Sequence, residues 1–301
     1  MNVNETILND RLEVIRSVIT EYGEEKFYIA FSGGKDSTVL SALVDMALPN
    51  NKIPRVYANT GIELNMIFEF VLALSDKDSR IKIINPITPI KPMLERDGYP
   101  FKSKKHAQYV KIYQKYKTTE NRPGIQHYLD IATDGKHWSN EERCPAKLRY
   151  QFTPEFLEHG VKISDLCCVR LKEEPLLKWA KANKRPISII GIMRSEGGRR
   201  KSATCLAFRG IKKKLVAFQP LTPLNKEWED WFIDTYNIAI CDIYKPPYNF
   251  VRTGCKGCPF AKNLSEELET LEKFFPAERK QCEFIWKPIY DEYRRIRYRL
   301  K

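Results

Sequence analysis

One short segment of the chain places a glycine turn beside residues that bind phosphate. It consists of Ser32, Gly33, Gly34, Lys35, Asp36, Ser37 and Thr38. The apolar run KFYIAFS leads into this turn and TVLSALVDMAL leads out of it, so a strand should end and a helix should begin here. The N–H groups of a helix N-terminus attract anions, and glycine lets a phosphate approach the backbone. We predict that the turn binds nucleotide phosphates, with hydroxyl donors, a positive charge from Lys35 and Mg²⁺ held by Asp36.

The spacing of this turn differs from two common nucleotide motifs. A Walker A loop needs a glycine five positions before the Gly-Lys pair, where this chain has Ile29. The dinucleotide fingerprint GxGxxG is absent as well. A structural turn with incidental charge is the alternative, but the strand and helix pattern that continues beyond it favours a phosphate site.

Three arginines form a second group of candidate phosphate ligands. RPISIIGIM is typical of a strand, and Arg194, Arg199 and Arg200 come directly after it. Ligands of α/β sheets bind at the carboxyl ends of the strands. This position favours nucleotide binding over a solvated basic loop.

Two pairs of cysteines could hold a metal. Cys167 and Cys168 are adjacent, and Cys255 and Cys258 form a CxxC in a loop that contains a glycine. Four thiolates bind Zn²⁺ or an iron–sulfur cluster. Adjacent cysteines would close a strained chelate on one ion, whereas the separate irons of a four-iron cluster accommodate them, so we favour the cluster. The alternative is a set of buried thiols with no ligand.

The remaining cysteines are expected to be structural or incidental, although a persulfide on one of them is left open. They are Cys144, Cys205, Cys241 and Cys282.

The elements around these residues predict an α/β fold, with a parallel sheet covered by helices on both faces. Strands are expected at KFYIAFS, PRVYANT, RIKIINP, RPISIIGIM and KLVAFQPL, and helices at residues 4–21, TVLSALVDMAL, MIFEFVLALSD, EEPLLKWAKAN and EWEDWFIDTYN. We predict one domain over residues 1–259, with a basic and mostly helical insertion at about 99–145, and a helical C-terminal extension over 260–301.

Composition and charge narrow the class of protein. The chain has 301 residues, of which 43% are hydrophobic, and a net charge of +13, which predicts a globular protein with anionic partners. Lysines and tyrosines alternate in the insertion, and Arg294, Arg295, Arg297 and Arg299 gather near the C-terminus. These residues could contact a nucleic acid or form solvated helix faces. No apolar run is long enough to cross a membrane, and we expect a cytoplasmic protein.

The motif SGGKDS resembles the PP-loop of the ATP pyrophosphatase superfamily, whose members cleave ATP between the α and β phosphates. The resemblance narrows to the phosphoadenosine phosphosulfate (PAPS) reductase family over residues from about 26 to 259. Asn59, Thr60 and Gly61 look like the family's segment after its second strand, and the arginine loop looks like its nucleotide loop. The resemblance implies an adenine nucleotide alpha hydrolase-like, Rossmann-like fold, a role for Lys35 and Asp36 in catalysis, and a 4Fe-4S cluster on the four paired cysteines.

Two enzymatic functions and one binding function remain open. The chain ends EYRRIRYRLK, without the cysteine-containing tail of assimilatory reductases. A similar combination of PP-loop and four cysteines occurs in the DndC-type component of DNA phosphorothioation systems and in enzymes that thiolate tRNA. We therefore expect ATP-dependent sulfur transfer to a nucleic acid, with sulfur supplied by a donor such as a cysteine desulfurase. The alternatives are a sulfonucleotide reductase and a nucleotide-binding scaffold. A homo-oligomer is compatible with the sequence.

Overall fold

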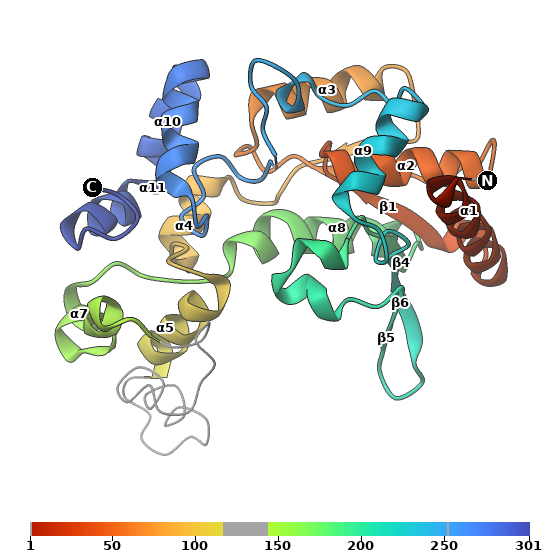
Figure 1. The fold of residues 1–301 in the computed structure, drawn as a ribbon. Coiled ribbons are helices and arrows are strands. Elements are labelled where there is room, and N and C mark those ends of the chain that lie inside the picture. The colour runs from red at the N-terminus through yellow and green to blue at the C-terminus, as the bar shows by residue number, and fades with distance from the viewer. Residues whose placement is uncertain (1, 117–143, 252) are drawn as a thin grey trace. The chain divides into compact units, whose positions relative to one another are not determined.

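The computed structural model describes residues 2–116, 144–251 and 253–301 (Figure 1). The chain forms two compact units. The first contains residues 1–59, 63–86 and 172–253, and the second contains residues 60–62, 87–171 and 254–301. The predicted domain over 1–259 is thus divided between the two units, and the predicted extension over 260–301 lies in the second.

The first unit is built on a six-stranded sheet with strand order β3-β2-β1-β4-β6-β5. Its strands are β1 (Phe27–Phe31), β2 (Arg55–Ala58), β3 (Ile81–Ile84), β4 (Ile187–Ile189), β5 (Leu206–Arg209) and β6 (Lys214–Phe218). All neighbours are parallel except β5, which pairs antiparallel with β6. The predicted α/β class is confirmed. The chain order of the strands reverses at β1, so the carboxyl ends of β1 and β4 flank a switch point, where such sheets bind ligands.

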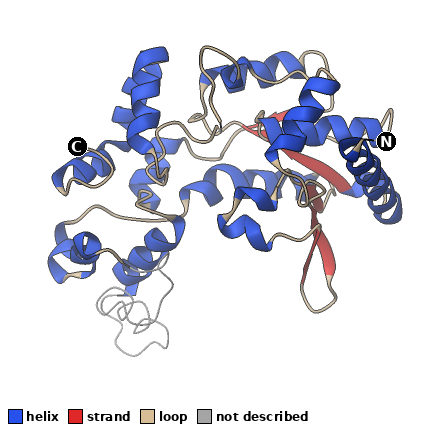
Figure 2. Ribbon diagram, viewed as in Figure 1, coloured by secondary structure: helices blue, strands red, loops and turns tan. Residues whose placement is uncertain are grey.

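Helices lie on both faces of this sheet (Figure 2). They are α1 (Val3–Tyr22), α2 (Lys35–Ala47), α3 (Asn65–Ser75), α8 (Glu174–Ala182) and α9 (Lys226–Thr235). The alternation of side chains in β1 explains the two layers. Phe27, Ile29 and Phe31 join the main core with residues of α1, α2 and α9, whereas Tyr28 packs in a second cluster with Ala180 of α8.

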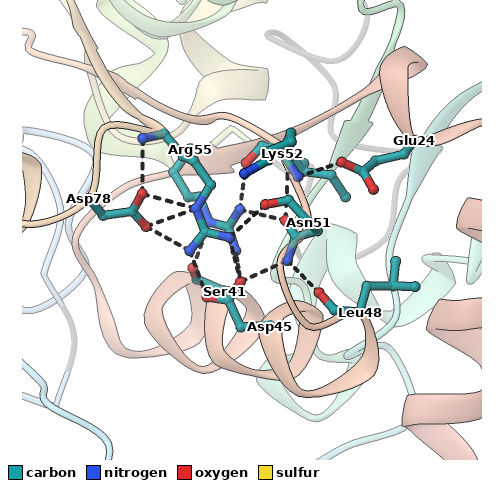
Figure 3. Close-up of polar contacts among 10 residues, drawn as sticks. Glu24, Ser41, Asp45, Leu48, Asn51, Lys52, Arg55 and Asp78 are labelled. Carbon is teal, nitrogen blue, oxygen red and sulfur yellow. Dashed lines mark hydrogen bonds and ion pairs between the residues drawn. The ribbon is translucent and has the colours of Figure 1, made fainter.

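A buried arginine ties β2 to α2 (Figure 3). Arg55 opens β2 and is 1% exposed. Its guanidinium lies 2.7 Å from Asp45 and donates to Ser41 Oγ at 3.0 Å and Asn51 Oδ1 at 2.9 Å. Asp45 also pairs with Arg80 at 2.7 Å. A buried cation needs such partners, so this network fixes the helix that begins at the glycine turn.

The second unit is mainly helical in its described part. Its helices are α4 (Ile90–Asp97), α5 (Lys104–Tyr116), α7 (Pro154–His159), α10 (Leu264–Phe274) and α11 (Pro276–Arg295). Phe101 packs edge-on against Tyr293 of α11 with ring centroids 4.6 Å apart. Helix α5 belongs to the predicted basic insertion, of which residues 117–143 lie outside the described residues.

Short helical turns connect these elements. They are η1 (Glu24–Lys26), η2 (Ala146–Phe152), η3 (Val169–Glu173), η4 (Arg194–Glu196), η5 (Gly198–Ser202) and η6 (Asp242–Tyr244). Among the described residues, no helix combines the length and the apolar character needed to cross a membrane.

Candidate functional site

The predicted glycine turn lies between β1 and α2, as the sequence indicates. Gly33 has a φ of +70°, and a Cβ at this position would lie 2.6 Å from Val71 Cγ2. Only glycine fits this position without displacing α3. Gly34 is the N-cap of α2, and Lys35 and Asp36 are its first residues. The positive end of the α2 dipole therefore lies at the turn.

The hydroxyl groups of the turn hold its own backbone. Ser37 Oγ donates to Gly34 O at 2.9 Å and accepts from Ser32 N at 3.2 Å. Thr38 Oγ1 donates to Gly34 O at 3.0 Å. The sequence predicts these hydroxyls as phosphate donors, and in this structure they stabilise the loop that presents the backbone N–H groups.

A cleft of about 430 Å³ opens beside the turn, entirely within the first unit. Ser32, Gly34, Lys35 and Asp36 contribute to one side, and Gly191, after β4, contributes to another. A Cβ on Gly191 would lie 2.9 Å from Asp36 O. Glycine thus allows the segment after β4 to approach the start of α2. The cleft lies at the carboxyl ends of β1 and β4, where the strand order predicts a ligand.

Helix α9 brings three charged residues to the turn that the sequence analysis missed. Lys226 lines the cleft, and Asp230 Oδ1 lies 3.1 Å from Lys35 Nζ. Glu229 forms an ion pair with Lys226 and is 1% exposed. Burial raises the pKa of Glu229 to about 7, Lys226 lowers it and the neighbouring Asp36 raises it. Polar residues three and four apart at the start of an amphipathic helix were the available signal.

The carboxylates of Glu229 and Asp36 form a donor pair suited to a hard cation. Glu229 Oε1 is buried and accepts no hydrogen bond within the described structure. Mg²⁺ is usually held by one or two carboxylates together with substrate phosphates and water. The residues therefore fit the predicted magnesium at Asp36.

The three predicted arginines have different surroundings. Arg200 lines the cleft and forms an ion pair with Glu196. Arg194 is exposed, and its Nε donates to Ala203 O at 2.8 Å. Arg199 lies in η5. Of Arg194 and Arg200, Arg200 is the one that lines the cleft.

Tyr244 and Thr253 complete the cleft, and the sequence analysis did not select either. The Tyr244 hydroxyl and Thr253 Oγ1 are hydrogen-bonded to each other, and a Cβ on Gly34 would lie 3.3 Å from the Tyr244 hydroxyl oxygen. Burial raises the pKa of Tyr244 to about 12. Its ring centroid is 5.7 Å from Lys35 Nζ. The aromatic ring gives the cleft a flat wall with a polar hydroxyl at its edge.

The predicted segment after β2 is divided between the two units. Asn59 belongs to the first, where its N–H donates to Ile84 O at 2.8 Å. Thr60 and Gly61 belong to the second. There, Lys256 N donates to Ile62 O at 2.8 Å, so this segment lies beside the loop that carries the CxxC.

The four predicted ligand cysteines all belong to the second unit. A hydrogen bond with Cys168 raises the pKa of Cys167 far above its ordinary value, and burial and the charges of Cys258 and Cys255 raise it further. Burial raises the pKa of Cys258, as do Cys255 and Cys168. The structure thus brings the two pairs together. Within the described residues, no three ligand side chains converge as one metal ion would require.

The CxxC loop is fixed by buried polar contacts. Lys256, between the two cysteines, is 2% exposed, and its Nζ lies 2.7 Å from Glu278 Oε2 on α11. Gly257 has a φ of +59°, and its N–H donates to Glu267 Oε1 at 2.8 Å. Trp286 Nε1 donates to Lys256 O at 3.0 Å. Cys255 and Cys258 are the two soft donors on this loop, and together with Cys167 and Cys168 they match the type of ligand that an iron–sulfur cluster uses.

The other cysteines are poor nucleophiles in this structure. Burial raises the pKa of Cys144, Cys205, Cys241 and Cys282, in the last case to about 12. A thiol with a raised pKa forms little thiolate at neutral pH.

Comparison with known proteins identifies the family. The sequence matches the phosphoadenosine phosphosulfate reductase domain over residues 26–136 and 113–261. No curated protein matches the sequence.

Three solved structures illustrate the similarity. The PAPS reductase from Candida auris, in its phosphate complex, is 10% identical, with a TM-score of 0.47, over 81% of this chain and 87% of that chain. The Candida glabrata FMN adenylyltransferase with FAD and pyrophosphate is 12% identical, with a TM-score of 0.48, over 84% of this chain and 62% of that one. The U34-tRNA thiolase NcsA from Methanococcus maripaludis, with its 4Fe-4S cluster, is 16% identical, with a TM-score of 0.39, over 97% of this chain and 80% of that chain. The family match spans more than half of the sequence, and the chain belongs to the phosphoadenosine phosphosulfate reductase domain family.

Proposed function

We propose that the chain binds ATP in the cleft beside the glycine turn and cleaves it between the α and β phosphates. One observation carries this proposal: the N-terminus of α2, with Lys35 and Asp36, borders a cleft that Arg200 and Lys226 also line. Backbone N–H groups and three cations around one cavity match the charge of a triphosphate. The resemblance of SGGKDS to the PP-loop supports cleavage at the α–β bond.

The residues of the cleft suit transfer of an adenylyl group. An oxygen of the acceptor would attack the α-phosphorus, and the bond to the bridging oxygen of the β phosphate would break. The leaving pyrophosphate takes the electron pair of that bond, and Lys35, Lys226 and the α2 N-terminus would stabilise its charge. Asp36 and Glu229 would hold Mg²⁺, which supplies further neutralisation of the phosphates.

We further propose that the adenylylated acceptor exchanges oxygen for sulfur. A sulfur nucleophile would form a bond to the activated atom of the acceptor, and AMP would leave with the former acceptor oxygen. A donor of the cysteine desulfurase class would supply the sulfur as a persulfide, and an external thiol would supply the two electrons that release it as hydrosulfide. Cys167, Cys168, Cys255 and Cys258 would hold a 4Fe-4S cluster, which can bind and present sulfur. The net charge of +13 favours a nucleic acid as the acceptor.

The test follows pyrophosphate release by the purified protein with ATP and Mg²⁺, with and without DNA or RNA. We expect release by the wild type, with Lys35→Ala and Asp36→Ala lowering it by at least about a hundredfold. Lys91→Ala, in the second unit, is the matched control and should retain activity. Release that persists in Lys35→Ala and Asp36→Ala would refute the assignment of the cleft. Reduction of a sulfonucleotide to sulfite without ATP cleavage would favour the reductase alternative.

A further inference from the structure

The antiparallel pair β5 and β6 forms a hairpin that extends from the edge of the first unit's sheet (Figure 1). We call residues 206–218 the hairpin arm. Every residue from 208 to 214 is exposed, and the turn contains two residues with a positive φ, Gly210 at +76° and Lys213 at +43°. These residues do not line the cleft. The proposed ATP chemistry therefore does not explain the hairpin arm.

The charge of the hairpin arm is strongly one-sided. Residues 197–226 contain eight lysines and arginines and neither aspartate nor glutamate. The arm itself carries Arg209, Lys212, Lys213 and Lys214. Within the described structure, none of these four side chains forms an ion pair with a carboxylate. Their positive charge is thus available to an external anion.

Unlike the cations of the hairpin arm, arginines near the C-terminus already have partners within the protein. Arg294 pairs with Glu283 and Arg295 with Glu292, and Arg299 donates to Pro259 O at 2.6 Å. Carboxylates already neutralise part of this cluster. The hairpin arm is therefore a better candidate for binding a polyanion than the cluster selected from the sequence.

Protection of a sheet edge does not account for these lysines. Charged residues on an edge strand prevent pairing with other chains, and β5 is the edge strand here. However, Lys212 and Lys213 lie in the turn, and Lys214 is the first residue of β6, where it pairs with Arg209 of β5. The charges of Lys212 and Lys213 lie outside both strands, where protection of a strand edge does not require them.

An apolar side chain lies among these cations. Ile211 is fully exposed at the tip, and Phe208 is 48% exposed. A two-stranded ribbon fits the major groove of B-form DNA, and apolar side chains contact the thymine methyl group there. Two apolar side chains offer little area for insertion into a lipid bilayer.

We propose that the hairpin arm is a binding arm for a DNA duplex. Arg209, Lys212, Lys213 and Lys214 contact the phosphates, and Ile211 contacts the groove. This inference rests on one part of the proposed function, namely that the acceptor is a nucleic acid. The hairpin arm would be the surface that binds this acceptor. It does not depend on cleavage of ATP.

The test compares two variants with the same change in charge. The first is Lys212→Glu/Lys213→Glu/Lys214→Glu. The matched control is Lys178→Glu/Lys181→Glu/Lys184→Glu, on and after α8, where the three lysines are also exposed. Binding of the full chain to a fluorescent duplex of about 20 base pairs, DNA or RNA, is measured by anisotropy between about 50 and 200 mM salt. Circular dichroism and pyrophosphate release show whether each variant is folded.

We expect the hairpin variant to lose at least about tenfold in affinity, with a slope of log K against log salt that is smaller by two to three units, or about 0.9 for each phosphate contact. In the control variant at Lys178, Lys181 and Lys184, the affinity and the salt slope should change much less. Ile211→Ser should weaken binding and leave the slope unchanged.

Three results would overturn the inference. Equal losses in the two triple variants would show that net charge alone governs binding. If the folded hairpin variant binds the duplex with wild-type affinity, the hairpin arm is not the binding surface. This result would not contradict a nucleic acid as the acceptor. No binding by the wild type to any duplex, or binding only to anionic lipid vesicles, would overturn the acceptor as well. Pyrophosphate release would then test the ATP site separately.

Discussion

Lys35 Nζ lies 3.1 Å from Asp230 Oδ1, so a carboxylate of α9 holds the cation of the glycine turn. The Asp230 side chain is 51% exposed, and the Lys35 side chain is 15% exposed. A pair this exposed contributes at most about 1 kcal/mol to stability. Its importance is local, because it fixes the position of Lys35 and competes with a phosphate for the same charge.

Asp230→Asn should therefore release Lys35 toward the cleft. We expect the affinity for pyrophosphate and for ATP to rise by up to about fivefold, which corresponds to the energy of an exposed ion pair. The free energy of unfolding should change by less than about 1 kcal/mol. Isothermal titration calorimetry measures the affinity, and Asp234→Asn on the same helix is the control. A tenfold loss of affinity would instead show that Asp230 positions Lys35 for the ligand.

Breaking the buried ion pair between Lys256 and Glu278 should destabilise the fold. Glu278→Gln leaves the Lys256 ammonium group buried without a counter-charge, and we expect the free energy of unfolding to fall by about 3 to 5 kcal/mol. Urea denaturation measures this loss. Lys256→Met/Glu278→Leu removes both charges and should recover most of it. A loss below about 1 kcal/mol in Glu278→Gln would contradict the buried position of the pair.

The short-range patterns of the sequence predicted much of the fold. Apolar β1 followed by Gly33 and Gly34 places the glycine turn at the start of α2 because every signal lies within about 20 adjacent residues. The predicted helix over residues 4–21 is confirmed as α1 for the same reason.

Long-range contacts account for what was missed. Lys35 and Asp230 are 195 positions apart, and no local pattern pairs them. Strand β5 was not predicted, because LAFR is short and its register depends on pairing with β6. Arg194 was predicted from its position after a strand, but its side chain binds Ala203 O.

His106 should make stability depend on pH. Burial lowers its pKa to about 4, and its Nε2 lies 2.7 Å from Gln151 Oε1. Because the unfolded chain takes up this proton near pH 6.5, folding stability is complete above that pH and falls as the pH decreases toward 4. When the pH falls from about 7.5 to about 5, this histidine should lower the free energy of unfolding by about 2 kcal/mol. His106→Gln should remove this part of the pH dependence in urea denaturation. If the stability of the wild type and of His106→Gln depended equally on pH, the assigned role of His106 would be refuted.

Serine at any of the four paired cysteines should abolish the proposed cluster. Protein purified without oxygen should be brown, absorb near about 400 nm and contain about four irons per chain. Cys167→Ser, Cys168→Ser, Cys255→Ser and Cys258→Ser should each lose the colour and the iron. Cys241→Ser is the control, because this thiol lies in the first unit and donates to Met66 O at 3.4 Å. One tightly bound zinc and no iron would show that the metal was wrongly assigned.

The bond that is cleaved in ATP tests the central claim most directly. Two analogues separate the alternatives: α,β-methylene ATP has no cleavable α–β bridge, and β,γ-methylene ATP has no cleavable β–γ bridge. Chromatography of the nucleotide products identifies the reaction. We predict that the wild type converts ATP to AMP and pyrophosphate, converts β,γ-methylene ATP to AMP, and leaves α,β-methylene ATP intact. Formation of ADP from ATP, together with cleavage of α,β-methylene ATP, would contradict the proposed function.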